Sequence, residues 1–249
     1  EPGCPRGDRA RQALGRYIRI QIDSRSRRFA DKLDTVMKKI LPFLVVLLGC
    51  ASASGNMIIT AVFDGPIPGG LPKGFELYVL DDIPDLSLYG VGSANNGGGS
   101  DGQEFTFPAG SAMAGSFLYV ASEATQFTAF FGFAPSFTSG AANVNGDDAI
   151  ELFNNGSVVD TYGDINIDGS GQPWDYMDGW AYRNNGTAAA GLAWQVGDWT
   201  YSGINALDGE TSNATAANPV PLGAFVSIPE PSAAALLLLG CALLGLRRR

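Results

Sequence analysis

The 249-residue chain contains no histidine. Without histidine a protein lacks its commonest general base and its commonest metal ligand, and the Ser-His and Cys-His nucleophile pairs cannot form. Catalysis would therefore depend on carboxylates. Because no nucleophile motif is present either, the sequence predicts a protein that is not an enzyme.

Cysteine and basic residues are both scarce between residues 54 and 227, which we call the central region. The three cysteines lie outside it, so it has neither a disulfide framework nor a thiolate metal site. It contains two basic residues, Lys73 and Arg183, against nineteen Asp and Glu, which gives a net charge of −17. Such a region repels nucleic acid and anionic membranes, because affinity for phosphate requires clustered cations. We expect no nucleic-acid partner.

Long apolar runs occur only at the two ends of the chain. The first lies in "MKKILPFLVVLLGCASASG", which starts at Met37 with two lysines and closes on the small residues Ala51 and Ala53. This order is typical of a secretory signal peptide, here a helix within residues 37–53 that is cleaved after Ala53. The apolar run is too short to span a bilayer. The expected partners at this end are the Sec translocase and signal peptidase.

Two alternatives remain open at the N-terminal end. "LLGC" also fits a lipoprotein cleavage box, in which Cys50 would be lipidated. Residues 1–36 are rich in arginine and lack apolar periodicity, and they precede Met37. We interpret them as upstream sequence included by an over-extended gene model; a genuine, disordered basic leader is the alternative.

The second apolar run, at residues 233–246, has a distinctive order of residues on either side of it. Pro229, Glu230 and Pro231 precede it, and Arg247, Arg248 and Arg249 follow it. The prolines keep the backbone extended before the run. As a helix the run would be about 21 Å long, a short transmembrane helix whose terminal arginines stay on the cytoplasmic side.

This arrangement, over residues 228–249, resembles the PEP-CTERM sorting signal of Gram-negative bacteria that make exopolysaccharide. The resemblance implies recognition and processing by a membrane exosortase. It also implies a protein that is exported, anchored by its C-terminal helix before processing, and then located at the cell surface or in the extracellular matrix. An ordinary tail anchor is the alternative.

The central region reads as strands and turns. Runs such as "NMIITAVFDG", "GFELYVLDD" and "GSFLYVAS" are rich in β-branched and aromatic residues and are bounded by turn formers. Two apolar segments, Ala149 to Phe153 and Ser157 to Tyr162, flank an Asn-Gly hairpin signal. Only Ser122 to Phe133 could form a short helix, with Ser122 as N-cap. Seven to nine short strands predict an antiparallel β-sandwich.

"VNGDDAIELFNNGSVVDTYGD" resembles the lamin-tail-type domain, and a weaker likeness extends over roughly residues 57–217. The resemblance implies an all-β fold, an immunoglobulin-like antiparallel β-sandwich in residues 54–227, flanked here by the signal helix and the short C-terminal hydrophobic helix. It implies a secreted module and no reaction. The nuclear roles of animal relatives do not carry over, because the region lacks a basic patch.

The best candidate for a ligand site is "DINIDGSGQPWD", which has the spacing of a calcium loop. The candidate ligands are Asp164, Asn166, Asp168, Ser170 and Asp175. Against calcium, the twelfth position is Asp rather than Glu and a predicted strand precedes the loop, so a solvated turn is the alternative. A second oxygen-rich loop contains Asn143, Asn145, Asp147 and Asp148.

Two further patterns have both a functional and an ordinary interpretation. Carboxylate pairs such as Glu76 with Asp81, or Asp147 with Glu151, could serve glycoside hydrolysis, although nineteen acids produce such pairs by chance. Aromatic residues crowd the last third of the region and form either a sugar-binding platform or a hydrophobic core. They are Trp174, Tyr176, Trp180, Tyr182, Trp194, Trp199 and Tyr201.

The sequence therefore favours a non-enzymatic secreted protein, a structural or adhesive component of the envelope or exopolysaccharide matrix. The alternative is a calcium-dependent carbohydrate-binding module with extracellular polysaccharide as partner. A secreted hydrolase, or its accessory domain, is a weaker alternative.

Overall fold

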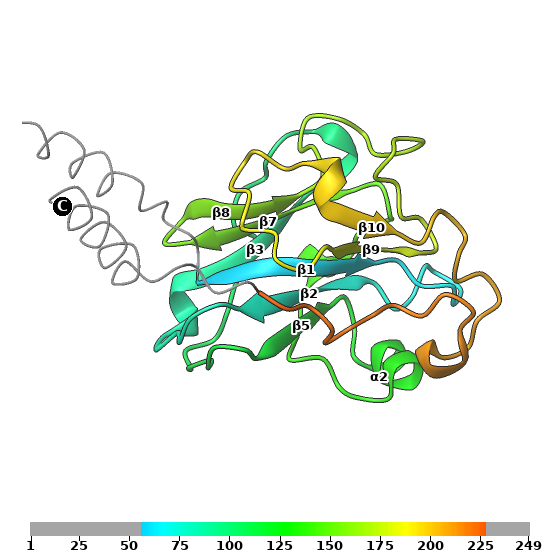
Figure 1. Cartoon of the computed structure of the whole chain (residues 1–249), viewed down its shortest axis with the longest axis horizontal. Helices are drawn as coiled ribbons and strands as arrows, with labels where there is room; N and C mark the ends of the chain where they lie inside the picture. The colour runs from blue at the N-terminus through cyan, green and yellow to red at the C-terminus, as the bar shows by residue number, and fades with distance from the viewer. Residues whose placement is uncertain (1–55, 228–249) are drawn as a thin grey trace, which may run out of the picture. The chain divides into compact units, whose positions relative to one another are not determined.

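A computed structural model describes residues 56–227, which form a mostly β structure with two sheets and one α-helix (Figure 1). The six-stranded sheet has the order β10-β9-β1-β2-β5-β6. Its strands are β1 (Met57–Phe63), β2 (Gly74–Val79), β5 (Phe117–Ala121), β6 (Phe137–Thr138), β9 (Trp180–Arg183) and β10 (Trp199–Tyr201). The four-stranded sheet has the order β4-β3-β7-β8. Its strands are β3 (Tyr89–Ala94), β4 (Phe105–Thr106), β7 (Ala149–Asn154) and β8 (Ser157–Tyr162).

Strand pairing differs from the expectation at one edge. Every pair is antiparallel except β5 with β6, which run parallel. The described residues contain ten strands rather than seven to nine, because β4 and β6 have two residues each and are too short to produce a periodic pattern. The expectation of a wholly antiparallel sheet was wrong at β6.

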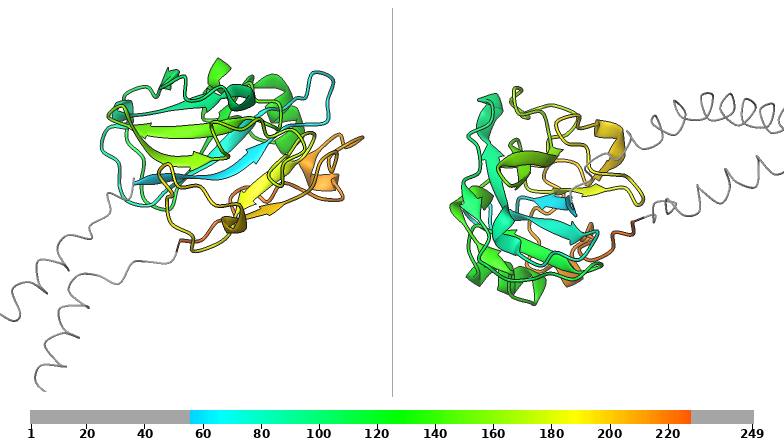
Figure 2. Two further views of the ribbon diagram at one scale, coloured as in Figure 1. Left: turned by 90° about the horizontal axis from the view of Figure 1, so that it is seen from above. Right: turned by 90° about the vertical axis from the view of Figure 1, so that its left-hand side faces the viewer.

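A shared hydrophobic core lies between the two sheets, which Figure 2 shows from two further directions. Alternate residues of each strand enter it, as the two-residue period of a strand requires. The large sheet contributes Ile59 and Leu77, and the small sheet contributes Val91, Ile150 and Leu152. Face-to-face packing of two sheets over one core is therefore established.

The opposite face of the six-stranded sheet carries a second core. Ile58, Ala61 and Phe63 of β1 pack there with Phe127 of helix α2 (Thr125–Phe131) and with Phe225 near the end of the described chain. The C-terminal segment, orange to red in Figure 1, thus covers the sheet as a third layer.

A buried ion pair joins the two sheets. Arg183 of β9 donates from Nη2 to Oδ2 of Asp160 of β8 at 2.6 Å, and neither side chain is exposed to solvent. The β1–β9 ladder covers only Ala61–Phe63. Beyond it, the backbone N–H of Ile59 donates to Asp160 at 2.8 Å, and its carbonyl accepts from Arg183 Nε at 2.6 Å. The pair therefore satisfies backbone groups of Ile59 beyond the end of the β1–β9 ladder.

Two local predictions have different outcomes. The hairpin of β7 and β8 is confirmed, with Asn155 at φ 49° and Gly156 at φ 74° in the turn, as a type I′ turn requires. The predicted N-cap at Ser122 is wrong. Helix α2 starts at Thr125, and the Glu123 carboxylate accepts from the N–H of Gln126 at 2.9 and 3.0 Å. Glu123 caps because its longer side chain reaches the first turn from outside the helix.

Within residues 56–227, no helix has the length and apolar content needed to cross a bilayer. The predicted leader (1–36), signal peptide (37–53) and sorting signal (228–249) lie outside the described residues. The same holds for the predicted cleavage residues Ala51 and Ala53 and for the sorting residues Pro229, Glu230, Pro231, Arg247, Arg248 and Arg249.

Candidate functional site

The loop predicted to bind calcium leaves β8 at Gly163 and crosses the end of the core. Gly163 adopts φ +81°, and a Cβ there would lie 2.9 Å from the Trp174 ring. Gly169 packs equally closely, since a Cβ would lie 2.5 Å from the Asp147 carbonyl oxygen and 2.6 Å from the Trp174 ring. These glycines are therefore required because the loop packs against Trp174 and the backbone of Asp147.

The carboxylates of this loop bind nearby backbone amides. Asp164 Oδ1 accepts from the N–H of Asn166, and Asp168 Oδ1 accepts from the N–H of Ser170, each at 2.9 Å. Asp175 accepts from the N–H groups of Gly171 at 2.8 Å and Met177 at 3.0 Å. The bonds to Asn166, Ser170 and Met177, each two residues after its aspartate, are typical of Asx turns.

The three aspartates of the predicted calcium loop are not gathered into one metal-binding group. Throughout residues 56–227 there is no group of three or more acidic, cysteine or histidine side chains arranged to hold a metal ion. The solvated-turn interpretation accounts for every contact of Asp164, Asp168 and Asp175 given above.

The second oxygen-rich loop is a structural corner. Asp148 is buried and accepts from the N–H groups of Asn96 and Asn145, each at 2.9 Å. The side chain of Asn145 accepts from Lys73 Nζ at 2.7 Å. Asp148 therefore fixes the backbone where β7 begins.

The neighbouring Asp147 is half-buried. Burial, and then the charge of Asp148, raise the pKa of Asp147.

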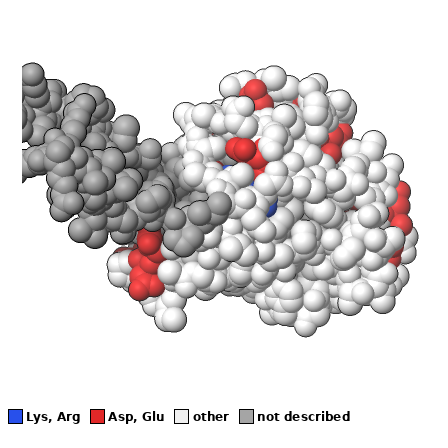
Figure 3. Space-filling model, viewed as in Figure 1, with Lys and Arg blue, Asp and Glu red and all other residues white. Residues whose placement is uncertain are grey.

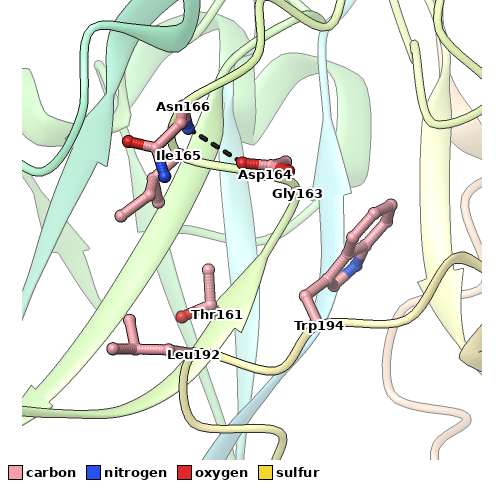
Figure 4. A pocket seen from close by; sticks show the side chains of 7 residues that line it. All are labelled: Thr161, Gly163, Asp164, Ile165, Asn166, Leu192 and Trp194. Atoms are coloured by element: carbon pink, nitrogen blue, oxygen red, sulfur yellow. Dashed lines mark hydrogen bonds between the residues drawn. The ribbon is translucent and has the colours of Figure 1, made fainter.

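A pocket of about 290 Å³ opens beside the end of β8 (Figure 4). One side comes from β8 and the start of the loop, and the other side comes from the segment before β10. The lining residues are Thr161, Gly163, Asp164, Ile165, Asn166, Leu192 and Trp194. The pocket thus combines an aromatic wall with a carboxylate and an amide.

Trp194 is held in place by other aromatic rings. Its ring meets Tyr162 edge-on, with centroids 6.0 Å apart, and Trp174 with centroids 5.8 Å apart. Its Nε1 and the hydroxyl of Thr161 are buried and have no hydrogen-bond partner among the described residues. Buried polar atoms normally have partners, so hydrogen-bonding capacity is left unused around this pocket.

The remaining aromatic residues do not form an exposed platform. Those buried in the two cores are Trp174, Tyr176, Trp180, Tyr182 and Trp199. Tyr201 is half-buried against the core between the sheets. The core interpretation is therefore correct for most of this set, and Trp194 is the member that lines the pocket.

A buried carboxyl group lies on the outer face of the large sheet. Glu76 of β2 accepts at Oε1 from the Thr60 hydroxyl at 2.7 Å, and at Oε2 from the N–H of Gly223 at 2.5 Å. The hydroxyl of Tyr182 lies 3.4 Å from Oε1. Burial raises the pKa of Glu76 to about 7. The C-terminal segment covers this carboxyl group.

The carboxylate pairs considered for glycoside hydrolysis do not form a shared open site. Glu76 is buried within β2, whereas Asp81 is exposed beyond the end of that strand. Glu151 is buried in β7 and accepts from the Ser100 hydroxyl, whereas Asp147 is half-buried in the preceding loop. A pair of acids flanking a bound sugar needs both groups accessible.

Both basic residues of the described chain are buried. Lys73 Nζ lies 3.2 Å from Asp64 Oδ1, and Arg183 forms an ion pair with Asp160. Burial raises the pKa of Asp64 to about 6, against the opposing influence of Lys73. The face in Figure 3 accordingly shows scattered acidic patches and almost no basic surface. The exposed charge of residues 56–227 is therefore acidic.

Sequence reasoning identified Asp164 and Asn166 but did not place them beside Thr161 and Leu192. The one sequence signal for this pocket was Trp194, a large aromatic residue in the small-residue stretch "TAAAGLAWQ". Neither family models, curated proteins nor solved structures produced a match to this chain. The site is therefore interpreted from its own residues.

Proposed function

We propose that the chain is a non-enzymatic secreted module that acts as a structural or adhesive component of a bacterial envelope or exopolysaccharide matrix. The observation that carries this proposal is the sign of the surface charge. Among residues 56–227, five of the nineteen acidic residues are buried and fourteen are not, while both basic residues are buried. A surface of this kind stays hydrated and repels nucleic acid and anionic lipid.

The roles of the buried acids support a module without catalysis. Asp160 holds Arg183, and Asp64 holds Lys73. Asp148 accepts two backbone N–H groups, and Glu76 accepts from Gly223 in the covering segment. Each is committed to a structural contact, and none faces the pocket beside β8.

In this proposal the two ends of the chain direct its export and its sorting. Residues 37–53 act as the signal peptide read by the Sec translocase and signal peptidase. Residues 228–249 act as the PEP-CTERM signal, which anchors the protein until an exosortase processes it. The central region is an immunoglobulin-like sandwich of the lamin-tail type, a proposal supported by the two face-packed sheets and the β7–β8 hairpin.

Cell fractionation tests this proposal. The chain and its Glu230→Gln variant are expressed in an exopolysaccharide-producing Gram-negative host that has an exosortase, with Glu210→Gln as a control outside the tail. The parent and the control should be recovered, shortened, at the surface or in the matrix, whereas Glu230→Gln stays full-length in the membrane fraction. Recovery of the uncut parent chain from the cytosol would overturn the proposal, and unchanged release of Glu230→Gln would overturn its sorting step.

A further inference from the structure

We propose that the pocket beside β8 binds one neutral sugar ring between Trp194 on one side and Asp164 with Asn166 on the other. This inference deepens the proposed function and rests on it for the source of the sugar, a surrounding polysaccharide. The pocket itself is defined by geometry alone (Figure 4).

The size of the pocket favours a single ring. Small-molecule sites usually measure about 300–1,000 Å³, and this pocket, at about 290 Å³, lies at the lower limit. One sugar unit of a longer chain can occupy such a space while its neighbours remain in solvent.

The apolar wall suits the C–H face of a sugar. Trp194 supplies a broad ring and Leu192 supplies aliphatic surface, and both line the pocket. The edge-on contacts of Trp194 with Tyr162 and Trp174 fix the orientation of the indole. A ring that is already ordered loses little side-chain entropy when a ligand stacks against it.

The polar wall suits hydroxyl groups. The Asn166 N–H occupies Oδ1 of Asp164 at 2.9 Å, and Oδ2 has no hydrogen-bond partner among residues 56–227. The exposed Asn166 side chain adds an amide that both donates and accepts. A carboxylate beside an amide can receive and supply hydrogen bonds to adjacent hydroxyls.

Charge selects a neutral ligand over an acidic one. Asp164 lines the pocket, and neither basic residue of the described chain does. A uronic acid or a phosphorylated sugar would place an anion beside Asp164 without compensation, which is unfavourable. Neutral hexoses avoid this repulsion.

The test follows the indole N–H signals of the purified full chain by nuclear magnetic resonance, in a zwitterionic detergent that has no sugar head group. The chain has four tryptophans, so the Trp194 signal is assigned by its loss in Trp194→Phe. The probes are the methyl glycosides of glucose, galactose and mannose, with methyl glucuronide as the anionic comparator. At least one neutral glycoside should shift the Trp194 signal saturably, and the glucuronide should not.

Asp164→Asn and Asp168→Asn form a matched pair of variants. Each aspartate accepts one backbone N–H at 2.9 Å in an Asx turn, but only Asp164 lines the pocket. Asp164→Asn should weaken glycoside binding about tenfold or more, because a charged acceptor is lost, and Asp168→Asn should not. The exposed Asn166→Ala provides a second weakening variant that leaves the fold intact.

The inference fails if no neutral glycoside shifts the Trp194 signal, if the glucuronide binds more tightly than the neutral glycosides, or if Asp164→Asn binds as tightly as the parent chain. These measurements use purified protein and do not depend on export. A negative result would therefore leave the fractionation outcome standing, and failed sorting would leave the binding result standing.

Discussion

Glu76 should make the protein more stable in mild acid than at slightly alkaline pH. The group is fully buried, and burial raises its pKa from 4.5 to about 7. A carboxyl whose pKa is raised in the folded state binds its proton more tightly there than in the unfolded state. Its stabilising contribution is therefore complete below about pH 4.5 and is lost as the pH rises through about 7.

The magnitude follows from the size of the pKa shift. At about 1.4 kcal/mol per pKa unit, the free energy of unfolding should fall by about 3 kcal/mol between pH 4.5 and pH 8. Glu76→Gln is uncharged at every pH, as the protonated acid is, and it should remove this dependence. Asp64, whose pKa is raised to about 6, contributes in an overlapping range but is the same in both proteins. The difference between the two proteins therefore isolates Glu76.

Urea unfolding at a series of pH values, followed by tryptophan fluorescence, measures both proteins. The exposed Asp101→Asn provides a control that removes one carboxylate without touching the sheet. We expect the parent and Asp101→Asn to lose stability in parallel, whereas Glu76→Gln becomes relatively more stable as the pH rises. A parent-minus-variant difference that is constant across this range would refute the reasoning.

Three further predictions concern the core, the loop and calcium. Arg183→Met should lower the free energy of unfolding by about 3–5 kcal/mol, because it leaves Asp160 charged and buried, and urea unfolding would show it; a loss below 1 kcal/mol would contradict the role of the pair. Gly169→Ala should cost about 1–3 kcal/mol by the same measurement, since its Cβ would press on Asp147 and the Trp174 ring, whereas Gly197→Ala has open space and should be neutral. Calcium and chelator should leave the melting temperature unchanged, because the loop aspartates belong to no group of three or more acidic side chains among residues 56–227 that could hold a metal ion; a clear rise with calcium would restore the metal-loop interpretation.

The strongest local signals gave the best predictions from sequence. The Asn155-Gly156 turn determines the β7–β8 hairpin, because both residues adopt positive φ angles that the pair tolerates well. Runs of β-branched and aromatic residues bounded by turn formers likewise predict β1 and β2, whose faces enter separate cores. Such features depend on residues that are neighbours along the chain, which is why they can be recognised without a structure.

Features that depend on distant residues could not be predicted in this way. The parallel pairing of β6 joins two residues to β5 after an intervening helix, and no periodicity announces it. The pocket requires Thr161 of β8 to face Trp194, which the chain brings back only after the loop and β9. The calcium-loop pattern is ambiguous for a different reason, because consecutive Asx turns have the same spacing of aspartates as a calcium loop.

The hydrogen bond from the N–H of Gly223 to Glu76 helps to decide how the fold resists a pulling force on its C-terminal segment. Gly223 is bonded to the middle of β2, and Phe225, two residues later, is buried in the outer core. Tension applied beyond residue 227 would first load Val226, whose N–H donates to Asn185 Oδ1 and whose carbonyl accepts from the N–H of Gly186. It would then load the bond between Gly223 and Glu76 on the central strand β2. The Gly223 N–H favours the charged carboxylate and so lowers the pKa of Glu76 against the larger effect of burial. This contact should therefore hold the C-terminal segment most firmly when Glu76 is ionised, above about pH 7, although the fold as a whole is more stable in acid.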